Sequence, residues 1–413
     1  MRDVATGAPY QSYLEEHVQR LDLSVPDASF DFPQSFYEHR LFFLGEAHGA
    51  QTALMLDLAM IRHLRQEAGV RHLMAELDFS QAERFNAYMD SGAESLVVPV
   101  FEAWLERSMQ WGNQQHFEKL RQLRELNLSL PASERVRFFG VDQIQDFDLA
   151  VDWLERRLDD LSDEATPGLA ELRSAVLAYA GDQEALGVEV EAALTRIADL
   201  SPAGNAAGLN LTEAMNLKAV THLARNLVRS AEGAGRYEMI QSNIRHMVED
   251  FGIGDDEKLY GFWGLFHVLK SLVNETAEPL AMRLADSDLP FADEIVSVAM
   301  VYSNSRQNMP SSMLPQSMRP ETPFFSATMS QDNPYLMYIA GIRDLKKVAG
   351  EAKAAVFRLD APGSPFLGST RLSEQSGILS KIFRFEVSPT DTVFVEYALL
   401  VRDSPALTAF EGP

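Results

Sequence analysis

Residues 42–78 read FFLGEAHGAQTALMLDLAMIRHLRQEAGVRHLMAELD, and this stretch decides the fold that the sequence predicts. An apolar run at 41–44 ends abruptly in Gly-Glu-Ala-His-Gly at 45–49, and a segment with apolar residues at helical spacing follows. A second apolar run then ends on Glu76. Two apolar runs joined through one helix are typical of a β-α-β unit, in which parallel strands are buried on both faces.

Further short apolar runs extend this pattern along the chain. They lie at 136–141, 258–263, 294–302, 354–359 and 392–402, and helical patterns fill much of the sequence between them. The sequence therefore predicts an α/β fold with a mostly parallel sheet flanked by helices.

The predicted domain organisation is a single α/β domain over residues 1–413 with one helical insertion. Nearly everything from 146 to 251 has helical spacing, which is more than one crossover needs, so we expect residues 160–235 to form an inserted helical subdomain that acts as a lid or a partner surface. Residues 303–334 are rich in Pro and Met with little periodicity, which predicts a long loop near the site. A helix is expected over 100–127, with Trp104 and Trp111 near one face.

Composition narrows the partners and the chemistry. The chain has 60 Asp and Glu against 36 Lys and Arg, a formal net charge of −24, which disfavours nucleic acid and anionic membrane surfaces as partners. It contains no cysteine, which excludes disulfides, thiol catalysis and thiolate metal sites. The expected partner is a small-molecule or peptide substrate, and the sequence leaves the oligomeric state open.

Targeting signals are absent from the printed sequence. The first residues contain no apolar core or small-residue cleavage site of a signal peptide. No apolar run reaches the roughly 18 residues that indicate a membrane span. We therefore expect a cytoplasmic protein, or a periplasmic or secreted one from which a leader has been removed.

Ionisable side chains stand where four of the predicted strands end. Glu46 and His48 follow the first strand, Glu76 the second, Asp142 the third and His267 the fourth. In an open α/β sheet, ligands bind outside the carboxyl ends of the parallel strands. We therefore expect these side chains to line one pocket.

Each of these residues also has a plainer explanation. The Gly-Glu-Ala-His-Gly turn suits a solvated loop, and a lone histidine such as His267 is usually a packed core residue. Asp142 fits the N-cap of a helix. Glu76 carries more weight, because an ionisable group at the end of a buried strand is costly unless it is paired.

Two mechanisms are open to Glu46, His48, Glu76 and His267. A histidine beside a carboxylate acts as an oriented general base on water. Two histidines and two carboxylates also suit a divalent metal ion such as Zn, Mn or Co, with one position left for water. Both routes end in hydrolysis. The sequence contains no Gly-x-Ser-x-Gly elbow, no phosphate-binding P-loop and no Gly-x-Gly-x-x-Gly.

Several blocks together resemble the erythromycin esterase family. In chain order they are LGEAHG, AELDFSQAERFNAYMDSG, VRFFGVD, RYEMIQSN, GFWGLFHVL and FVEYALLVRDSPA. The family is similar in turn to haem-binding iron-uptake lipoproteins and to Tiki-type proteases. The resemblance implies a parallel α/β core with a helical insertion and a deep polar cleft.

The resemblance also implies roles for individual residues. His48 maps to the proposed base that activates water, with Glu46 and Glu76 as supporting acids. Arg236 and Asn243 lie in the block similar to the family's Arg-Asp-x-x-Met-x-x-Asn helix, and with Asp142 they are the expected substrate-binding residues. His267 maps to the second histidine of the family's His-Asn-x-His motif.

The chain departs from the esterases at three positions. One residue, Ala47, separates Glu46 from His48 where the esterases have two. Gly264 stands in place of their first motif histidine, and Asp57 stands near the position of an arginine. The resemblance therefore implies hydrolysis of an ester, lactone or amide and leaves the substrate open.

Two other functions fit the same fold. The first-motif spacing and the loop rich in Met and aromatic residues suit a protein that binds haem or another iron-containing ligand, for which an axial His, Tyr or Met would be needed. A non-catalytic relative whose helical insertion binds a protein partner is the remaining alternative.

Overall fold

A computed structural model describes residues 7–24, 29–162, 168–199, 211–251, 253–254, 256–381 and 386–413. The chain divides into two compact units. Unit 1 comprises Met1–Leu73, Phe101–Arg137 and Asp255–Pro413, and unit 2 comprises Met74–Val100 and Phe138–Gly254.

The main sheet has eight strands in the order β1-β11-β13-β6-β2-β5-β3-β4. The strands are β1 Val18–Leu21, β2 Leu41–Glu46, β3 His72–Ala75, β4 Arg137–Gly140, β5 Leu259–Gly264, β6 Ile295–Ser303, β11 Ala354–Arg358 and β13 Tyr397–Arg402. Four pairs are parallel, namely β13–β6, β6–β2, β2–β5 and β5–β3, whereas β1–β11 and β11–β13 are antiparallel. The predicted mostly parallel α/β sheet is confirmed.

Strand β2 lies in the middle of this sheet, between β5 and β6. All six of its residues are buried, as expected for a parallel strand that is covered on both faces. The register places Glu46 beside Gly264 of β5 and Gly45 beside Ala299 of β6. The carboxyl ends of β2 and β5 therefore meet at one edge of unit 1.

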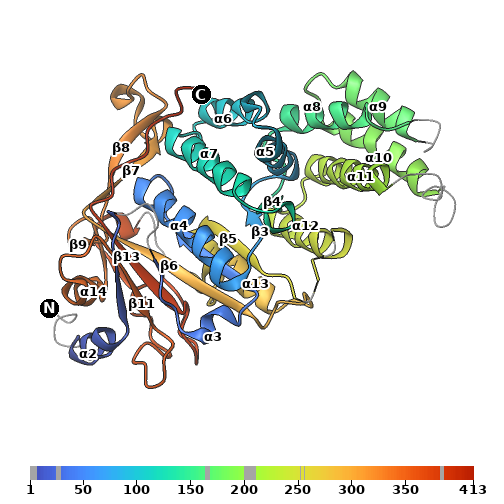
Figure 1. Ribbon diagram of the computed structural model, residues 1–413. Helices are drawn as coiled ribbons and strands as arrows, with labels where there is room; N and C mark the ends of the chain where they lie inside the picture. Colours follow the sequence, from blue (N-terminus) through green and yellow to red (C-terminus); the bar gives the residue numbers. More distant parts are fainter. Residues whose placement is uncertain are drawn as a thin grey trace. The chain divides into compact units, whose positions relative to one another are not determined.

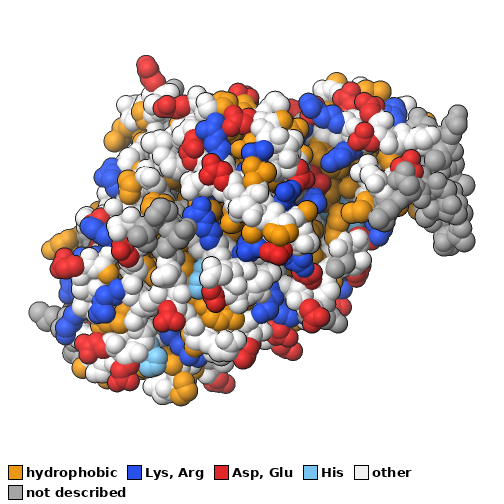
Figure 2. All heavy atoms as spheres, in the orientation of Figure 1, with side chains coloured by type: hydrophobic (Ala, Val, Ile, Leu, Met, Phe, Trp, Pro, Cys, Tyr) orange, Lys and Arg blue, Asp and Glu red, His pale blue; other side chains and the backbone are white. Residues whose placement is uncertain are grey.

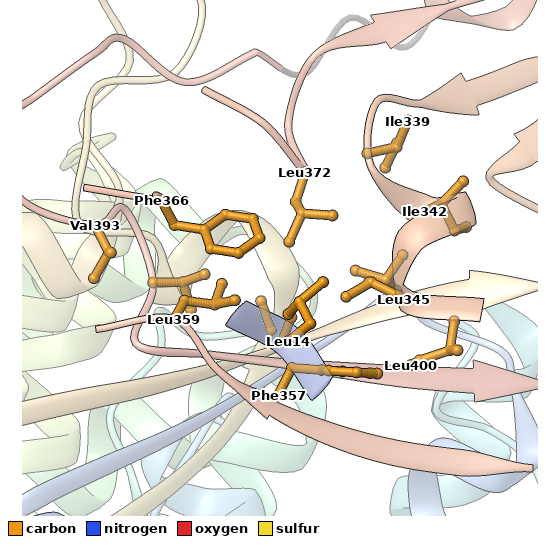
Figure 3. Packing of buried hydrophobic residues seen from close by; sticks show 14 of the residues in the cluster. Leu14, Ile339, Ile342, Leu345, Phe357, Leu359, Phe366, Leu372, Val393 and Leu400 are labelled. Carbon is orange, nitrogen blue, oxygen red and sulfur yellow. The ribbon is translucent and has the colours of Figure 1, made fainter. Parts of the chain in front are cut away.

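The helices of unit 1 pack against the sheet and against one another. They include α2 Ala8–Glu16, α3 Gln34–Tyr37, α4 Gln51–Ala68, α7 Gln114–Leu128, α13 Leu280–Ala285 and α14 Ile342–Ala349. Helix α4 packs against α7, and α14 packs against α2 (Figure 1). A buried cluster joins α2 and α14 to β11 and β13 through Leu14, Ile342, Leu345, Phe357 and Leu400 (Figure 3).

Unit 2 is mainly helical. Its helices are α5 Phe79–Ser91, α8 Phe147–Leu158, α9 Leu169–Ala178, α10 Gln183–Asp199, α11 Leu211–Ala231 and α12 Arg236–Asp250. Helix α10 packs against both α9 and α11, and α8 packs against α9 and α11 (Figure 1). Their core contains Leu154, Leu172, Val190, Leu223 and Leu227.

The predicted insertion at 160–235 contains α9, α10 and α11, and parts of it, 163–167 and 200–210, lie outside the described residues. Its use as a lid or a partner surface stays a prediction.

The segment 303–334 differs from the long loop that the sequence predicts. It contains an antiparallel hairpin of β7 Ser305–Pro310 and β8 Phe324–Met329, followed by the short strand β9 Asp332–Asn333. Two single-turn helices, Ser311–Met313 and Gln316–Met318, lie between the hairpin strands. Four of the five prolines stand at the end of β7 or in the connection and the fifth, Pro334, follows β9, so none removes a hydrogen bond from a strand interior.

The predicted helix over 100–127 is two helices, α6 Val98–Glu106 and α7 Gln114–Leu128. The chain breaks at Ser108, which has a left-handed φ of 55°. At Gly112 it packs so closely on α6 that a Cβ there would lie 2.7 Å from the Leu105 nitrogen. Trp104 is therefore helical and buried, whereas Trp111 lies in the connection.

The surface in view carries both signs of charge. Figure 2 shows acidic side chains interspersed with Lys and Arg over this face. None of the helices in the described part of the chain is both long and apolar enough to cross a membrane.

His116 on α7 is a buried histidine, and its protonation makes the stability of unit 1 depend on pH. Its ring stacks on Trp104, with centroids 5.5 Å apart and planes at 12°. Burial, reinforced by the charge of Lys119, lowers the pKa of His116 well below its usual value of 6.5. The folded protein therefore holds this ring neutral at a pH where the unfolded chain protonates it.

We expect the free energy of unfolding to decrease as the pH falls below about 6.5, by up to about 1.4 kcal/mol per pH unit for this one group. Urea unfolding of the wild type and of His116→Gln at pH 7.5 and pH 5.5 tests this. The variant should lose less stability between the two pH values. An equal loss in both proteins would contradict the expectation.

Candidate active site

A carboxylate and an imidazole form a hydrogen-bonded pair at the end of β2. Glu46 is the last residue of the strand and only 4% exposed, whereas the His48 side chain is 29% exposed. The Nδ1 atom of His48 donates to Oε1 of Glu46 over 2.7 Å. The pair joins a buried acid to a ring that solvent reaches.

Two glycines set the backbone on either side of this pair. A Cβ at Gly45 would lie 2.3 Å from a methyl group of Val268. Gly49 has a φ of +98°, and its carbonyl oxygen accepts from the amides of Asn308 and Leu407, each over 3.0 Å. A side chain at Gly45 would clash, and a side chain at Gly49 would be strained. The Gly-Glu-Ala-His-Gly spacing therefore has a structural reason.

Residues of the connection between α6 and α7 contact His48. The ring of Trp111 meets the imidazole edge-on, with centroids 5.0 Å apart and planes at 68°. Gln110 donates from Nε2 to the carbonyl oxygen of His48 over 3.1 Å. These contacts restrict the orientation of the ring and of its backbone.

Gly264, at the end of β5, lies between two histidines. A Cβ at this position would be 3.1 Å from Nε2 of His48 and 3.5 Å from Cδ2 of His267. His267 follows on the single-turn helix η3 Leu265–Val268, is 7% exposed and packs edge-on against Trp263. The structure thus brings Glu46, His48 and His267 together, and the absence of a side chain at Gly264 leaves room for His48.

Tyr302 of β6 supports the strand end from within the core. Its hydroxyl accepts from the amide of Ala47 over 3.4 Å and donates to Sδ of Met300 over 3.1 Å. Burial, followed by the negative charge of Glu46, raises the pKa of Tyr302 well above 10. The phenol therefore stays protonated and neutral beside the carboxylate.

Asp57 forms a buried polar group on α4, near the position where the esterases have an arginine. Its carboxylate accepts from Nζ of Lys119 over 2.6 Å and from the hydroxyl of Tyr260 over 2.7 Å. Burial and the charge of Asp57 raise the pKa of Tyr260 well above 10. The buried carboxylate of Asp57 is therefore compensated by the charge of Lys119 and the hydroxyl of Tyr260.

A second group of predicted site residues comes together within unit 2. Arg236, the first residue of α12, donates from Nε and Nη2 to the two carboxylate oxygens of Asp142 over 2.9 and 2.7 Å. Nη2 also donates to Oε1 of Glu76 over 2.7 Å. Burial opposes the charge of Arg236, but the two carboxylates outweigh it and raise the pKa of the guanidinium. We name these three residues the Arg236 cluster.

Asn243 on α12 hydrogen-bonds to the backbone beside the Arg236 cluster. Its amide donates to the carbonyl oxygens of Val141 and Asp142, each over 3.1 Å, and the residue is 3% exposed. Asn243 therefore ties α12 to the segment after β4 and holds the backbone that carries Asp142.

The predicted residues thus fall into one group in each unit. Glu76, expected as a partner of Glu46 and His48, is bound to Arg236, and its support of the base stays a prediction. Sequence reasoning missed Gln110, Trp111 and Tyr302 as neighbours of the pair. Tyr302 closes an apolar run, which is the signal that could have identified it.

The metal alternative receives no support from the described residues. Among them, no three or more His, Cys, Asp or Glu side chains are grouped so as to hold a metal ion. The Glu46 carboxylate is bound to Nδ1 of His48. The reaction proposed for this site therefore gives no metal-binding role to Glu46, His48, Glu76 and His267.

Comparisons with known proteins show a resemblance to one family and a shared fold. A sequence model of the erythromycin esterase family matches residues 66–251. No curated protein matches the chain. A crystal structure of a Bacillus cereus protein has a TM-score of 0.66 at 14% identity, covering 98% of this chain and 99% of that one.

Two further solved structures share the fold. One is described as a succinoglycan biosynthesis protein, with a TM-score of 0.64, 13% identity and coverage of 98% and 99% of the two chains. The other is a mutant of the erythromycin esterase EreC in its open conformation, with a TM-score of 0.60, 16% identity and coverage of 96% and 100%. The predicted resemblance of this chain to the erythromycin esterase family is therefore confirmed, in sequence over residues 66–251 and in the fold.

Proposed function

We propose that this protein hydrolyses an ester, lactone or amide bond, with His48 as the general base that activates water. The observation that carries the proposal is the 2.7 Å hydrogen bond from Nδ1 of His48 to Glu46. A carboxylate on Nδ1 fixes the tautomer in which Nε2 carries the lone pair. The ring is 29% exposed, so water reaches it.

The proposed reaction needs no covalent intermediate on the protein. Nε2 of His48 takes a proton from water as the oxygen attacks the carbonyl carbon, and a tetrahedral oxyanion forms. The imidazolium then returns the proton to the leaving oxygen or nitrogen as the carbon–leaving-group bond breaks. Glu46 stabilises the imidazolium between these steps. All protons are accounted for by one water and one histidine.

Further residues are proposed to contact the substrate. His267 lies beside Gly264 and His48, and we assign it a contact with the carbonyl or the oxyanion. Arg236 is 35% exposed although its guanidinium binds two buried carboxylates, so we assign it recognition of a polar or anionic group. Glu76 and Asp142 position Arg236, and Asn243 positions Asp142.

The substrate is proposed only as a bond class. One structural neighbour is an erythromycin esterase, but this chain has Gly264 where the esterases have a histidine. Haem binding and a non-catalytic role remain predictions from the sequence. A haem titration without a Soret shift would contradict the first, and ester turnover that depends on His48 would contradict the second.

Removal of the base should abolish most of the activity. With p-nitrophenyl butyrate as substrate, we expect His48→Ala to lower kcat by about 10²- to 10⁴-fold, the usual contribution of a general base. Glu46→Gln should lower kcat by a smaller factor and leave KM nearly unchanged, because it disturbs the tautomer and not the substrate contacts.

His39→Ala is the matched control, since His39 is partly exposed and its Nδ1 hydrogen-bonds to the nearby carbonyl of Phe36. Its turnover should equal that of the wild type. Full turnover by a folded His48→Ala would overturn the proposal.

A side chain at Gly264 should displace the base. In Gly264→Ala the new methyl group would lie 3.1 Å from Nε2 of His48, closer than carbon and nitrogen normally approach, so the ring must move. We expect at least about a tenfold loss of kcat, as a misplaced catalytic group produces. Gly254→Ala, whose new methyl group would meet no atom of the described residues within 4 Å, is the control. Equal kcat values for both variants would contradict the expected crowding.

Removal of the Arg236 side chain should destabilise the protein, because the buried carboxylates of Glu76 and Asp142 would lose the positive charge that compensates them. Breaking a fully buried ion pair costs about 3–5 kcal/mol, and the partial exposure of Arg236 reduces our expectation for Arg236→Met to about 2 kcal/mol. Adding Glu76→Gln should restore part of this loss because it removes one uncompensated charge. Urea unfolding of both variants measures the effect. A double variant less stable than the single one would contradict the pairing.

A further inference from the structure

Unit 1 contains a cavity of about 460 Å³ that the proposed reaction does not use. It lies among β6, β8, β10 Met337–Ile339, β12 Gln375–Ser376 and β13. Ile339 and Leu372, which line it, stand at the margin of the buried cluster (Figure 3). Its size is within the roughly 300–1,000 Å³ of pockets that hold small molecules.

The wall of this cavity carries no charge. None of the described residues that line it is Asp, Glu, Lys, Arg or His. Four methionines, Met300, Met309, Met329 and Met337, contribute to the wall, and their unbranched thioether chains adapt to apolar ligands of different shape. A charged group would be costly to bury here, so the ligand must be uncharged where it enters the cavity.

Two polar side chains of the wall are hydrogen-bonded within the protein. Oε1 of Gln331 accepts from the amide of Tyr302 over 2.7 Å, and Oγ of Ser373 donates to the carbonyl of Thr370 over 2.7 Å. Among the described residues, Oε1 of Gln375 is buried without a hydrogen-bond partner. This atom has less than 1 Å² of exposed surface, so a ligand in the cavity would not contact it. The recognition that this wall offers is therefore apolar.

The cavity also touches the segments that carry the proposed active site. Ala47, which separates Glu46 from His48, is part of its wall, and so is Leu265, two residues before His267. A ligand in the cavity would therefore contact the same backbone that positions both histidines.

We propose that this cavity receives an uncharged, apolar portion of the substrate. This assignment rests on the proposed hydrolase function and narrows its substrate class to esters or amides with a long apolar group.

The first test measures binding without catalysis. Nile red fluorescence reports occupancy of the full-length His48→Ala protein, and 1-decanol and decyl methyl ether are the competing probes. Both should displace Nile red, because the wall recognises the alkyl chain and not its polar end. Met337→Trp, which fills the cavity, should weaken the binding of Nile red. Failure of either probe to compete, or Nile red binding that Met337→Trp leaves unchanged, overturns the ligand assignment whether or not the protein is a hydrolase.

The second test uses turnover. For p-nitrophenyl esters from butyrate to octanoate, wild-type kcat/KM should rise about threefold to fourfold per methylene. Met337→Trp should flatten this series, because the indole leaves no room for the longer chains. Leu336→Trp is the matched control, since Leu336 is 41% exposed and is not part of the cavity wall.

The outcomes separate the two proposals. Probe binding with a chain-length series that Met337→Trp flattens supports the substrate role. Probe binding with a series that Met337→Trp leaves unchanged overturns it. No ester turnover by the wild type overturns the hydrolase proposal and the substrate role together, whereas the binding test alone decides the ligand class. A Soret shift on haem addition that Met337→Trp abolishes also overturns the substrate role, because haem would then occupy the cavity.

Discussion

A buried carboxylate at the end of a central strand is the constraint on which this site depends. Glu46 is 4% exposed, and a carboxylate in such a place is strongly destabilising unless a partner compensates its desolvation. The imidazole of His48 is that partner. The same hydrogen bond that makes the buried acid tolerable also orients the ring, which is what the proposed general base requires.

The surrounding fold maintains this pair from several sides. Parallel pairing of β2 with β5 places Gly264 beside Glu46, and the missing side chain leaves space for the imidazole. Gly49 turns the chain with a positive φ, and its carbonyl is held by two amides. Tyr302 supplies a neutral phenol beside the acid. In this arrangement the pair is fixed before any ligand binds, which is what general base catalysis requires of its oriented group.

Much of the fold and part of the site were predictable from the residues alone. The seven apolar runs became strands of the main sheet, and the positions of Glu46, His48 and His267 followed from where those runs end. The β7–β8 hairpin was missed because its strand residues are largely polar and flanked by prolines. The sequence predicts a helix through Trp111, because the seven-residue spacing of Trp104 and Trp111 gives no sign that the helix ends before Ser108. The bond from Arg236 to Glu76 joins residues that are 160 positions apart, and no local pattern encodes such a pairing.

The central claim is that Glu46 holds His48 in the tautomer whose Nε2 accepts a proton. Imidazole ¹⁵N chemical shifts of histidine-labelled protein at alkaline pH test it directly, with His48→Ala to assign the resonances and Glu46→Gln to remove the acceptor. The account predicts that His48 carries its proton on Nδ1 and that Glu46→Gln shifts the tautomer toward Nε2. A His48 protonated on Nε2 in the wild type would contradict it.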